Sequence, residues 1–306
     1  MGRNGLLAVG GVLVLGLTGC AGGAGGGPVA SPTSPAAAQA VTQQAAPLRI
    51  LLTNDDGWSA PGVVAVRKAL RRAGHTVVEV APADDQSGTG ASLTLKGTLS
   101  LTAHGQDVWA VGGRPADAAA VGLRSVMASA PPDLVVSGIN SGHNVSESAI
   151  HSGTVGAAMT AVEFGVPAIA VSGPSTGGNA DPAQFAAAAD YTARLVGRLA
   201  ADRGQGPLLP DEMVLNVNYP KVAAGAVAAE VRSVPTSDTP LIDLSYTAGP
   251  KGVLTPTLVQ GTSTDPDDDA GAVAAGSVAL TDLATDPEPP SPDFGVADRL
   301  AGSVQP

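Results

Sequence analysis

The chain has 306 residues, which is enough for one large domain or two ordinary ones. Hydrophobic residues make up 44% of it and charged residues only 14%, so it can bury a sizeable core, and wholesale disorder is excluded. The formal net charge of −11 argues against binding of a nucleic-acid duplex, whose phosphate backbone requires a basic surface. A small anionic substrate is compatible with this charge, because a bound metal ion reverses the sign locally.

The first 20 residues have the pattern of an export signal. Arg3 precedes an apolar run from Leu6 to Leu17, which is too short to cross a membrane as a helix but suits the core of a signal peptide. The only cysteine, Cys20, follows Leu-Thr-Gly, where a bacterial lipobox places the cysteine that receives the lipid. We therefore predict a lipoprotein signal peptide over residues 1–20, lipidation at Cys20, and a body anchored outside the cytoplasmic membrane. An uncleaved anchor, or a signal peptide with a coincidental cysteine, is the alternative.

Composition divides the remainder of the chain. Residues 21–47 carry no charge and are rich in Gly, Pro, Ser, Ala and Gln, which predicts a flexible tether. From residue 48 the pattern changes to short apolar runs and amphipathic stretches, and we expect one folded domain over residues 48–284. Residues 285–306 are rich in proline and acidic residues and are expected to be a disordered tail.

Strand-like and helix-like segments alternate within this domain. Strands are expected at 48–53, 76–80, 108–111, 133–136, 167–171 and 213–218, and helices at 61–73, 115–129, 153–164 and 182–201. This alternation predicts an α/β fold with a doubly wound, mostly parallel, Rossmann-like sheet. Beyond Tyr219 the pattern loosens into short β-like pieces, so we expect an irregular C-terminal β extension.

Polar segments follow the strands at the edge of the sheet where such folds bind ligands. The residues concerned are Asn54, Asp55, Asp56, Ser87 and Asn140, followed by a helix start at Ser152, Gly153 and Thr154. Two adjacent carboxylates after a buried strand repel each other unless a cation lies between them, and free N–H groups at a helix start suit a phosphate. Each segment taken alone also fits an ordinary turn or helix cap.

Together these segments closely resemble the SurE family of metal-dependent 5′/3′-nucleotidases. The resemblance runs in unbroken order from Leu48 to Val171, through LRILLTNDDGWSAPGV, VAPADDQSGTGASLTL, VVSGINSGHN and SGTVGAAM, and returns at LLPDEMVLNVNYP. It implies a site for one divalent cation with the ligands Asp55, Asp56, Ser87 and Asn140. This all-oxygen set suits Mg²⁺ or Mn²⁺.

The resemblance also implies an activity and an assembly. The expected substrates are nucleoside monophosphates or other small phosphomonoesters. The expected catalytic residues are Asn54, Asp55 and Asp56, and the residues expected to hold the phosphate are Asn144, Ser152, Gly153 and Thr154. Which carboxylate, if either, takes a proton from the attacking water is left open. Family members are dimers or tetramers, which implies a homodimer or homotetramer here with Thr236–Val259 as the assembly arm.

Departures from the family pattern lie at the rim of the expected site. Asn-Val-Ser-Glu-Ser at residues 144–148 stands where the family has Asn-Leu-Gly-Asp-Asp, and His151 replaces a tyrosine. These changes bear on substrate preference more than on the metal site. His143 also flanks the pocket, and Trp58 is placed either to stack on a base or to pack as a lid.

The sequence also offers three alternatives. Residues 173–177 fit the G-x-S-x-G pattern of a hydrolase nucleophile, but all four histidines precede Ser175, contrary to the order that such enzymes require. A lipoprotein that binds a nucleotide or metal without catalysis is the alternative function, and the four intact ligand positions argue against it. The acidic segment 265–269 fits a solvated loop better than a calcium loop, because the EF-hand spacing and its final glutamate are missing.

Overall fold

The computed structural model describes residues 46–175, 185–204, 206–261, 263, 265–285 and 295–306. The chain divides into one unit over Met1–Gln43 and a second over Gln44–Pro306, and only the second contains described residues. The expected signal peptide, Cys20 and nearly all of the expected tether therefore lie outside the described residues. Within the part of the chain that is described, no helix is long and apolar enough to cross a membrane.

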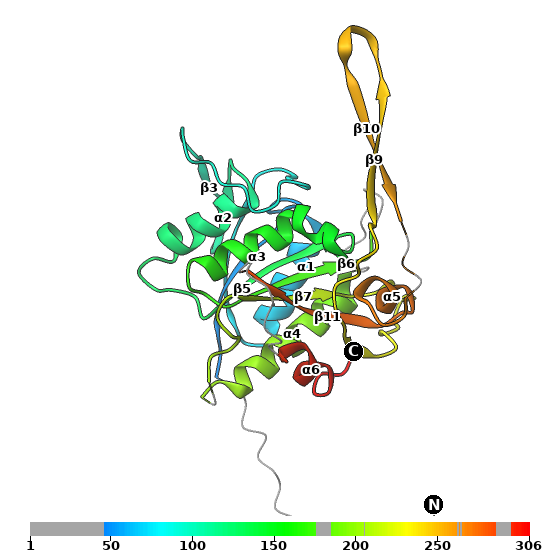
Figure 1. Ribbon diagram of the computed structural model, residues 1–306. Coiled ribbons are helices and arrows are strands. Elements are labelled where there is room, and N and C mark those ends of the chain that lie inside the picture. The colour runs from blue at the N-terminus through cyan, green and yellow to red at the C-terminus, as the bar shows by residue number, and fades with distance from the viewer. Residues whose placement is uncertain (1–45, 176–184, 205, 262, 264, 286–294) are drawn as a thin grey trace, which may run out of the picture. The chain divides into compact units, whose positions relative to one another are not determined.

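A nine-stranded sheet forms the centre of the second unit (Figure 1). Its strand order is β3-β4-β2-β1-β5-β6-β7-β11-β8. The strands are β1 Arg49–Thr53, β2 Thr76–Pro82, β3 Leu101–Ala103, β4 Val108–Val111, β5 Leu134–Ser141, β6 Ala168–Gly173, β7 Met213–Asn218, β8 Val231–Ser233 and β11 Val278–Ala284. The neighbours from β4 to β7 run parallel, whereas β3 and β11 pair antiparallel with β4 and β7. The predicted doubly wound, mostly parallel sheet is confirmed.

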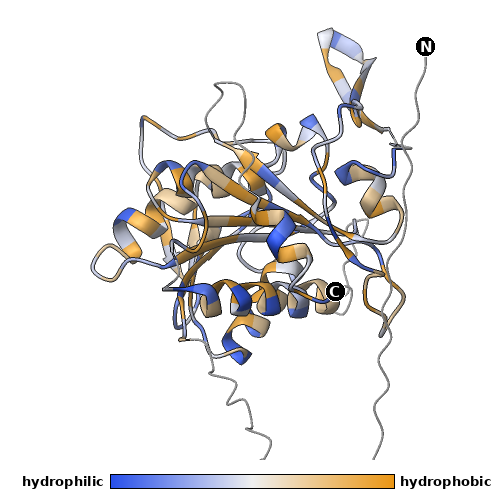
Figure 2. Cartoon of the chain, turned by 60° about the horizontal axis from the view of Figure 1, so that its bottom comes forward, coloured by the Kyte–Doolittle hydropathy of each residue, from blue (hydrophilic) through white to orange (hydrophobic). Residues whose placement is uncertain are grey.

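Helices cover both faces of this sheet, which is why its central strands are continuous apolar runs. The helices are α1 Pro61–Arg72, α2 Pro115–Val121, α3 Gly153–Glu163, α4 Ala186–Asp202, α5 Asp269–Ala274 and α6 Val296–Ala301. Ile50 and Leu52 of β1 enter a core cluster with α1, α4 and α6, whereas Leu51 enters a second cluster with α2 and α3. Figure 2 shows mainly apolar colours along the central strands. The sheet is thus buried between two apolar layers.

The expected helix over 115–129 is shorter in the structure. The α-helical part, α2, ends at Val121, and the chain continues as a π-helical turn over Gly122–Val126. This turn lies directly on β1, since a Cβ atom on Gly122 would be only 2.6 Å from a methyl carbon of Leu51.

The C-terminal extension contains one long regular element. β9 Ile242–Ala248 and β10 Leu254–Gln260 pair antiparallel along their whole length and form a hairpin that extends away from the sheet (Figure 1). Its apolar side chains are exposed, among them Leu244, Tyr246 and Leu258. The hairpin falls largely within the segment that the sequence assigned to an assembly arm. An exposed apolar hairpin of this kind is a surface that other chains can cover.

The end of the chain differs from the expected disordered tail. Residues 296–301 form α6, and Val296, Leu300 and Val304 are buried in the same core cluster as α1 and α4. The carboxylate of Asp282 on β11 accepts hydrogen bonds from the backbone N–H groups of residues 296 and 297, at 3.0 and 3.1 Å. The prediction is therefore wrong for residues 295–306, while residues 286–294 lie outside the described part.

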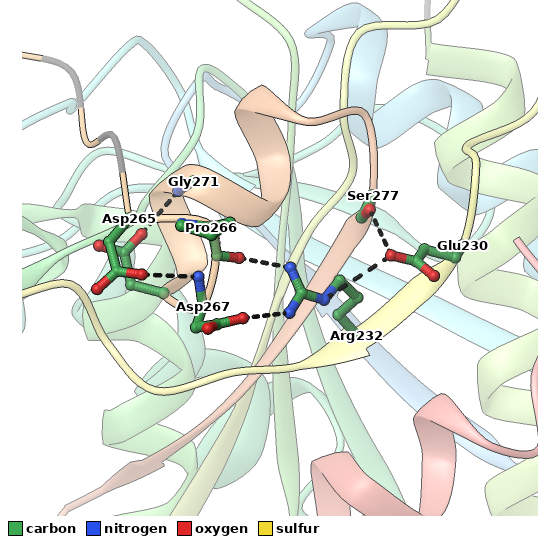
Figure 3. Close-up of polar contacts among 8 residues, drawn as sticks. Glu230, Arg232, Asp265, Pro266, Asp267, Gly271 and Ser277 are labelled. Carbon is green, nitrogen blue, oxygen red and sulfur yellow. Dashed lines mark hydrogen bonds and ion pairs between the residues drawn. The ribbon is translucent and has the colours of Figure 1, made fainter.

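The acidic segment 265–269 also differs from the expected solvated loop. Asp268 and Asp269 are buried, and Asp268 caps α5 by accepting a hydrogen bond from Gly271 N at 2.7 Å. Asp267 is exposed, but its carboxylate pairs with Arg232 of β8 at 2.8 Å (Figure 3). The segment is a structural turn, in which each of these carboxylates has a protein partner.

Candidate active site

The chain turns sharply after β1, and the turn presents two carboxylates at the end of the sheet. Asn54 Nδ2 donates to the backbone oxygen of Gly57 at 2.9 Å, which closes the turn. Asp55 is 2% exposed, and its carboxylate accepts a hydrogen bond from the Thr154 hydroxyl. Asp56 accepts from the backbone N–H of Ser141, the last residue of β5, at 3.0 Å. The turn is thereby tied to the end of β5 and to the start of α3.

Burial makes the charges of this pair costly. Burial raises the pKa of Asp55, although hydrogen bonds from Thr154 lower it. Burial, and then the neighbouring Asp55 charge, raises the pKa of Asp56 to about 7. The side-chain oxygen of Asn54, Oδ1, is also buried and has no hydrogen-bond partner in the described part of the chain. The turn therefore offers carboxylate oxygens that no ion pair among the described residues neutralises.

The start of α3 lies against the first of these carboxylates because it carries no bulky side chain. A Cβ atom on Gly153 would lie 2.8 Å from Cβ of Asp55 and 2.8 Å from Cγ of Pro115. Ser152 caps the helix, and its hydroxyl accepts from the N–H of Val155 at 3.2 Å. Of the expected phosphate-binding residues, Thr154 is thus hydrogen-bonded to Asp55 through its hydroxyl, and the hydroxyl of Ser152 caps the helix.

The two remaining predicted metal ligands come from the loop after β2 and from the end of β5. Gln86 N donates to the backbone oxygen of Asp55 at 2.8 Å, which brings the loop that carries Ser87 to the turn. Ser87 is exposed, however, and its hydroxyl donates to Asp85 at 2.7 Å. Asn140 lies where the β5–β6 register shifts, and its Nδ2 donates to Gly142 O at 2.8 Å. The structure thus brings Asp55, Asp56 and Asn140 to one edge and turns Ser87 towards Asp85.

The described residues contain no group of three or more His, Cys, Asp or Glu side chains arranged to hold a metal ion. A cation at this edge would therefore depend on the two carboxylates together with neutral oxygen donors. Neutral oxygens are ordinary partners of carboxylates around Mg²⁺ and Mn²⁺.

Comparison with known proteins assigns the family. The model for survival protein SurE matches residues 50–238, which is more than half of the chain. The chain belongs to the SurE family. It is 42% identical over 184 residues to the 5′-nucleotidase SurE of Geobacter sulfurreducens, an alignment that spans 60% of this chain and 66% of that one. It is 38% identical over 250 residues to the 5′-nucleotidase SurE of Xanthomonas campestris pv. campestris strain B100, spanning 78% and 90%.

The fold also resembles that of a solved structure of the SurE family. The SurE protein from Aquifex aeolicus is 30% identical and superposes with a TM-score of 0.67, covering 79% of this chain and 95% of that chain. The likeness extends well beyond the motif segments.

Sequence reasoning missed an asparagine cluster that holds Asn144 in this SurE fold. The backbone N–H of Asn144 donates to Oδ1 of Asn218 at 2.8 Å. The backbone oxygen of Asn144 accepts from the side-chain amides of Asn216 and Asn218 at 2.8 and 3.0 Å. Its side-chain amide donates to the hydroxyl of Ser172 at 2.9 Å. The signal was present as the alternation Asn216-Val217-Asn218 at the end of β7, which places both amides on one face of the sheet.

The aromatic and histidine candidates at the rim are engaged in other contacts. The rings of Trp58 and His104 stack with centroids 3.8 Å apart, which favours packing over base stacking for Trp58. His143 Nε2 lies 2.9 Å from the backbone oxygen of Tyr219, and burial lowers its pKa. The side chain of His151 is exposed. The Gly-x-Ser-x-Gly turn leaves the described residues after Ser175.

A cavity of about 430 Å³ opens beside the candidate site. Gly142, His143 and Asn144 line the end nearest to Asn140, so we call it the Asn144 cavity. Its other walls come from the base of the β9–β10 hairpin, including Leu241 and Ile242, from α5, and from Ser175 and Lys221, which follow β6 and β7. Its size falls in the range of small-molecule pockets.

Proposed function

We propose that this protein hydrolyses nucleoside monophosphates and releases inorganic phosphate, and that it requires a divalent cation, Mg²⁺ or Mn²⁺. The observation that carries the proposal is the pair of adjacent carboxylates at the end of β1, the buried Asp55 and the half-buried Asp56, in a chain whose SurE relatives are named 5′-nucleotidases. Hydrolysis of 3′-monophosphates is part of the proposal and rests on the family resemblance alone.

The donor set supports the cation. Asp55, Asp56 and Asn140 provide carboxylate and amide oxygens, and the buried Asn54 oxygen lacks a protein partner in the described part of the chain. Ser87 would complete the set after its hydroxyl leaves Asp85. Bound there, the cation would supply positive charge that polarises a phosphate oxygen.

The chain's own groups fix the geometry of the reaction. The Thr154 hydroxyl and the Ser141 N–H each hold one carboxylate in place. The N-terminal turn of α3 directs its partial positive charge towards the end of β1, where the phosphate would lie. Asn54 Nδ2 donates one of its two N–H groups to Gly57, and its Oδ1 has no hydrogen-bond partner among the described residues, so this side chain offers the site both a donor and an acceptor.

Location and assembly belong to the same proposal. Residues 1–20 would direct export and lipidation at Cys20, and residues 21–47 would hold the domain off the membrane. The exposed apolar side chains of the β9–β10 hairpin would be covered by another copy of the chain, giving a homodimer or homotetramer.

The test is phosphate release from adenosine 5′-monophosphate, measured with added Mg²⁺ or Mn²⁺ and again after EDTA treatment and metal return. We expect turnover with metal, loss of turnover in EDTA, and recovery when metal is restored. Nucleotide binding without turnover under any metal condition would instead establish the non-catalytic binder.

A further inference from the structure

One buried carboxylate connects three walls of the Asn144 cavity, namely the loop after β5, the segment before the hairpin and α5. Asp269, the first residue of α5, is 1% exposed. Its two oxygens accept from the backbone N–H of Ser146 at 3.1 and 3.0 Å, and Oδ1 also accepts from the backbone N–H of Ser237 at 3.0 Å. Its own N–H donates to the oxygen of Pro235 at 3.0 Å. Ser146 belongs to the loop after β5, and Ser237 lies before the hairpin.

This carboxylate holds a loop that would not keep its shape unaided. Ser146 has φ +61°, a backbone conformation that costs a non-glycine residue roughly 1–3 kcal/mol. The next residue, Glu147, donates its N–H to the oxygen of Ser237 at 3.3 Å, so loop and hairpin base meet on both sides of the carboxylate. Hydrogen bonds to an ionised acceptor are stronger than neutral ones, which suits a carboxylate at this junction.

The end of the cavity at Asn144, one of the expected phosphate-binding residues, is held by different contacts. We call it the phosphate end. Asn144 is fixed by hydrogen bonds with Asn216, Asn218 and Ser172. Among the described residues, none of these three is hydrogen-bonded to Asp269. Removal of the Asp269 carboxylate would therefore loosen the cavity walls and leave the phosphate end in place.

We propose that Asp269 is a positioning residue, which sets the shape of the Asn144 cavity, and that this cavity receives the leaving group of the phosphomonoester. The inference rests on the proposed hydrolase function. It separates recognition of the leaving group from recognition of the phosphate within one site.

The neighbouring Asp268 provides a matched control. It is 7% exposed and belongs to the same turn, where it accepts from Gly271 N at 2.7 Å and from the Ser263 hydroxyl at 2.6 Å. It also contacts the Ser237 hydroxyl, but it has no hydrogen bond to the loop 142–148 among the contacts of the described residues. Damage to α5 alone would therefore affect variants of both residues, whereas loss of the contact to the loop 142–148 would affect only a variant of Asp269.

The kinetic test compares Asp269→Ala with Asp268→Ala. In Asp269→Ala we expect KM for adenosine 5′-monophosphate to rise about tenfold, with kcat and the Ki of inorganic phosphate each within about twofold of wild type, as loss of leaving-group contacts requires. In Asp268→Ala all three should stay within about twofold. Equal KM values in the two variants, or a parallel rise in the phosphate Ki, would overturn the proposal. If Asp269→Ala does not fold, Asp269→Asn, which keeps one acceptor oxygen, should show a smaller change in the same direction.

Hydrogen exchange tests the contact independently of activity. The amides of residues 145–148 should exchange faster in Asp269→Ala than in Asp268→Ala. Unchanged exchange there would refute the positioning role. If the wild-type protein turns over no nucleotide, the proposed function and the leaving-group assignment both fail, while faster exchange would still establish the role of Asp269 in holding the loop.

Discussion

Two glycines at the start of α3 determine how closely this helix approaches the turn after β1 and the loop after β2. A Cβ atom on Gly153 would lie 2.8 Å from Cβ of Asp55, and one on Gly156 would lie 2.3 Å from the backbone carbonyl of Gly90. Contacts this short force the helix or the turn to move. The distance between Asp55 and the proposed phosphate-binding end of α3 therefore depends on residues that contribute no side chain.

We predict that Gly153→Ala lowers phosphate release by about 100-fold, because a shift of about 1 Å between positioned groups has an effect of that size. Overpacking should also reduce the free energy of unfolding by about 1–3 kcal/mol. Gly197→Ala in α4 is the control, since a Cβ atom there meets nothing within 4 Å. That variant should keep full activity. Equal activity of the two variants would show that α3 need not touch the turn.

Glu79 gives a prediction about pH. It is 0% exposed on β2, and burial raises its pKa to about 7, although Arg67 at 2.5 Å lowers it. The folded protein therefore binds this proton more tightly than the unfolded chain, so the stability contributed by Glu79 falls as pH rises from about 4.5 to about 7. Urea denaturation should show wild type losing roughly 2 kcal/mol relative to Glu79→Gln over that range. A constant difference between the two proteins would contradict the raised pKa.

The residues of the candidate site differ in how far the sequence could reveal them. Asp55 and Asp56 are adjacent and follow a buried strand, so the local sequence alone indicates them as candidate site residues. The contacts of Asn144 are not, because its partners lie on β6 and β7, more than 25 residues away along the chain. The same holds for Asp269, whose backbone partners come from two separate loops. Local patterns indicate the two carboxylates, whereas the contacts of Asn144 and Asp269 depend on tertiary packing.

At the scale of elements, α6 shows how a short helix gains its order. Six residues cannot form a stable helix alone, since nucleation is costly. Here Asp282 of β11 accepts from the first N–H groups of α6, and Val296 and Leu300 fill the core beside α1 and α4. The sequence predicted the buried strands because their apolar runs are continuous. It failed at the tail because the cap lies on a strand, 14 residues before the helix.

Deletion of residues 295–306 is therefore expected to destabilise the protein by about 3–5 kcal/mol, from the loss of buried Val and Leu side chains. Asp282→Ala should have a smaller effect, about 1 kcal/mol, as loss of a helix cap does. Both effects are measured by thermal or chemical denaturation. A deletion variant with wild-type stability would instead support the disordered tail that the sequence predicts.

At the scale of the whole molecule, the N-terminal segment should decide where the enzyme works. Cys20 is the only cysteine of the chain, so a lipid at this position would be the sole thioether anchor. We predict that Cys20→Ala shifts the protein from the membrane fraction to the soluble fraction or blocks processing of residues 1–20. Fractionation and intact mass test this together. A Cys20→Ala protein of mature mass that still sediments with membranes would refute lipid anchoring at this residue.

Phosphate release by Asp55→Asn and Asp56→Asn tests most directly whether the paired carboxylates after β1 are required for phosphomonoester hydrolysis. Each variant should remain folded, by circular dichroism, and lose at least about 100-fold in turnover of adenosine 5′-monophosphate at saturating Mg²⁺ or Mn²⁺. Asp190→Asn serves as the control, because this carboxylate is exposed and pairs only with Arg72 among the ion pairs of the described residues. It should retain wild-type turnover. Turnover near the wild-type value in folded Asp55→Asn or Asp56→Asn would contradict the account.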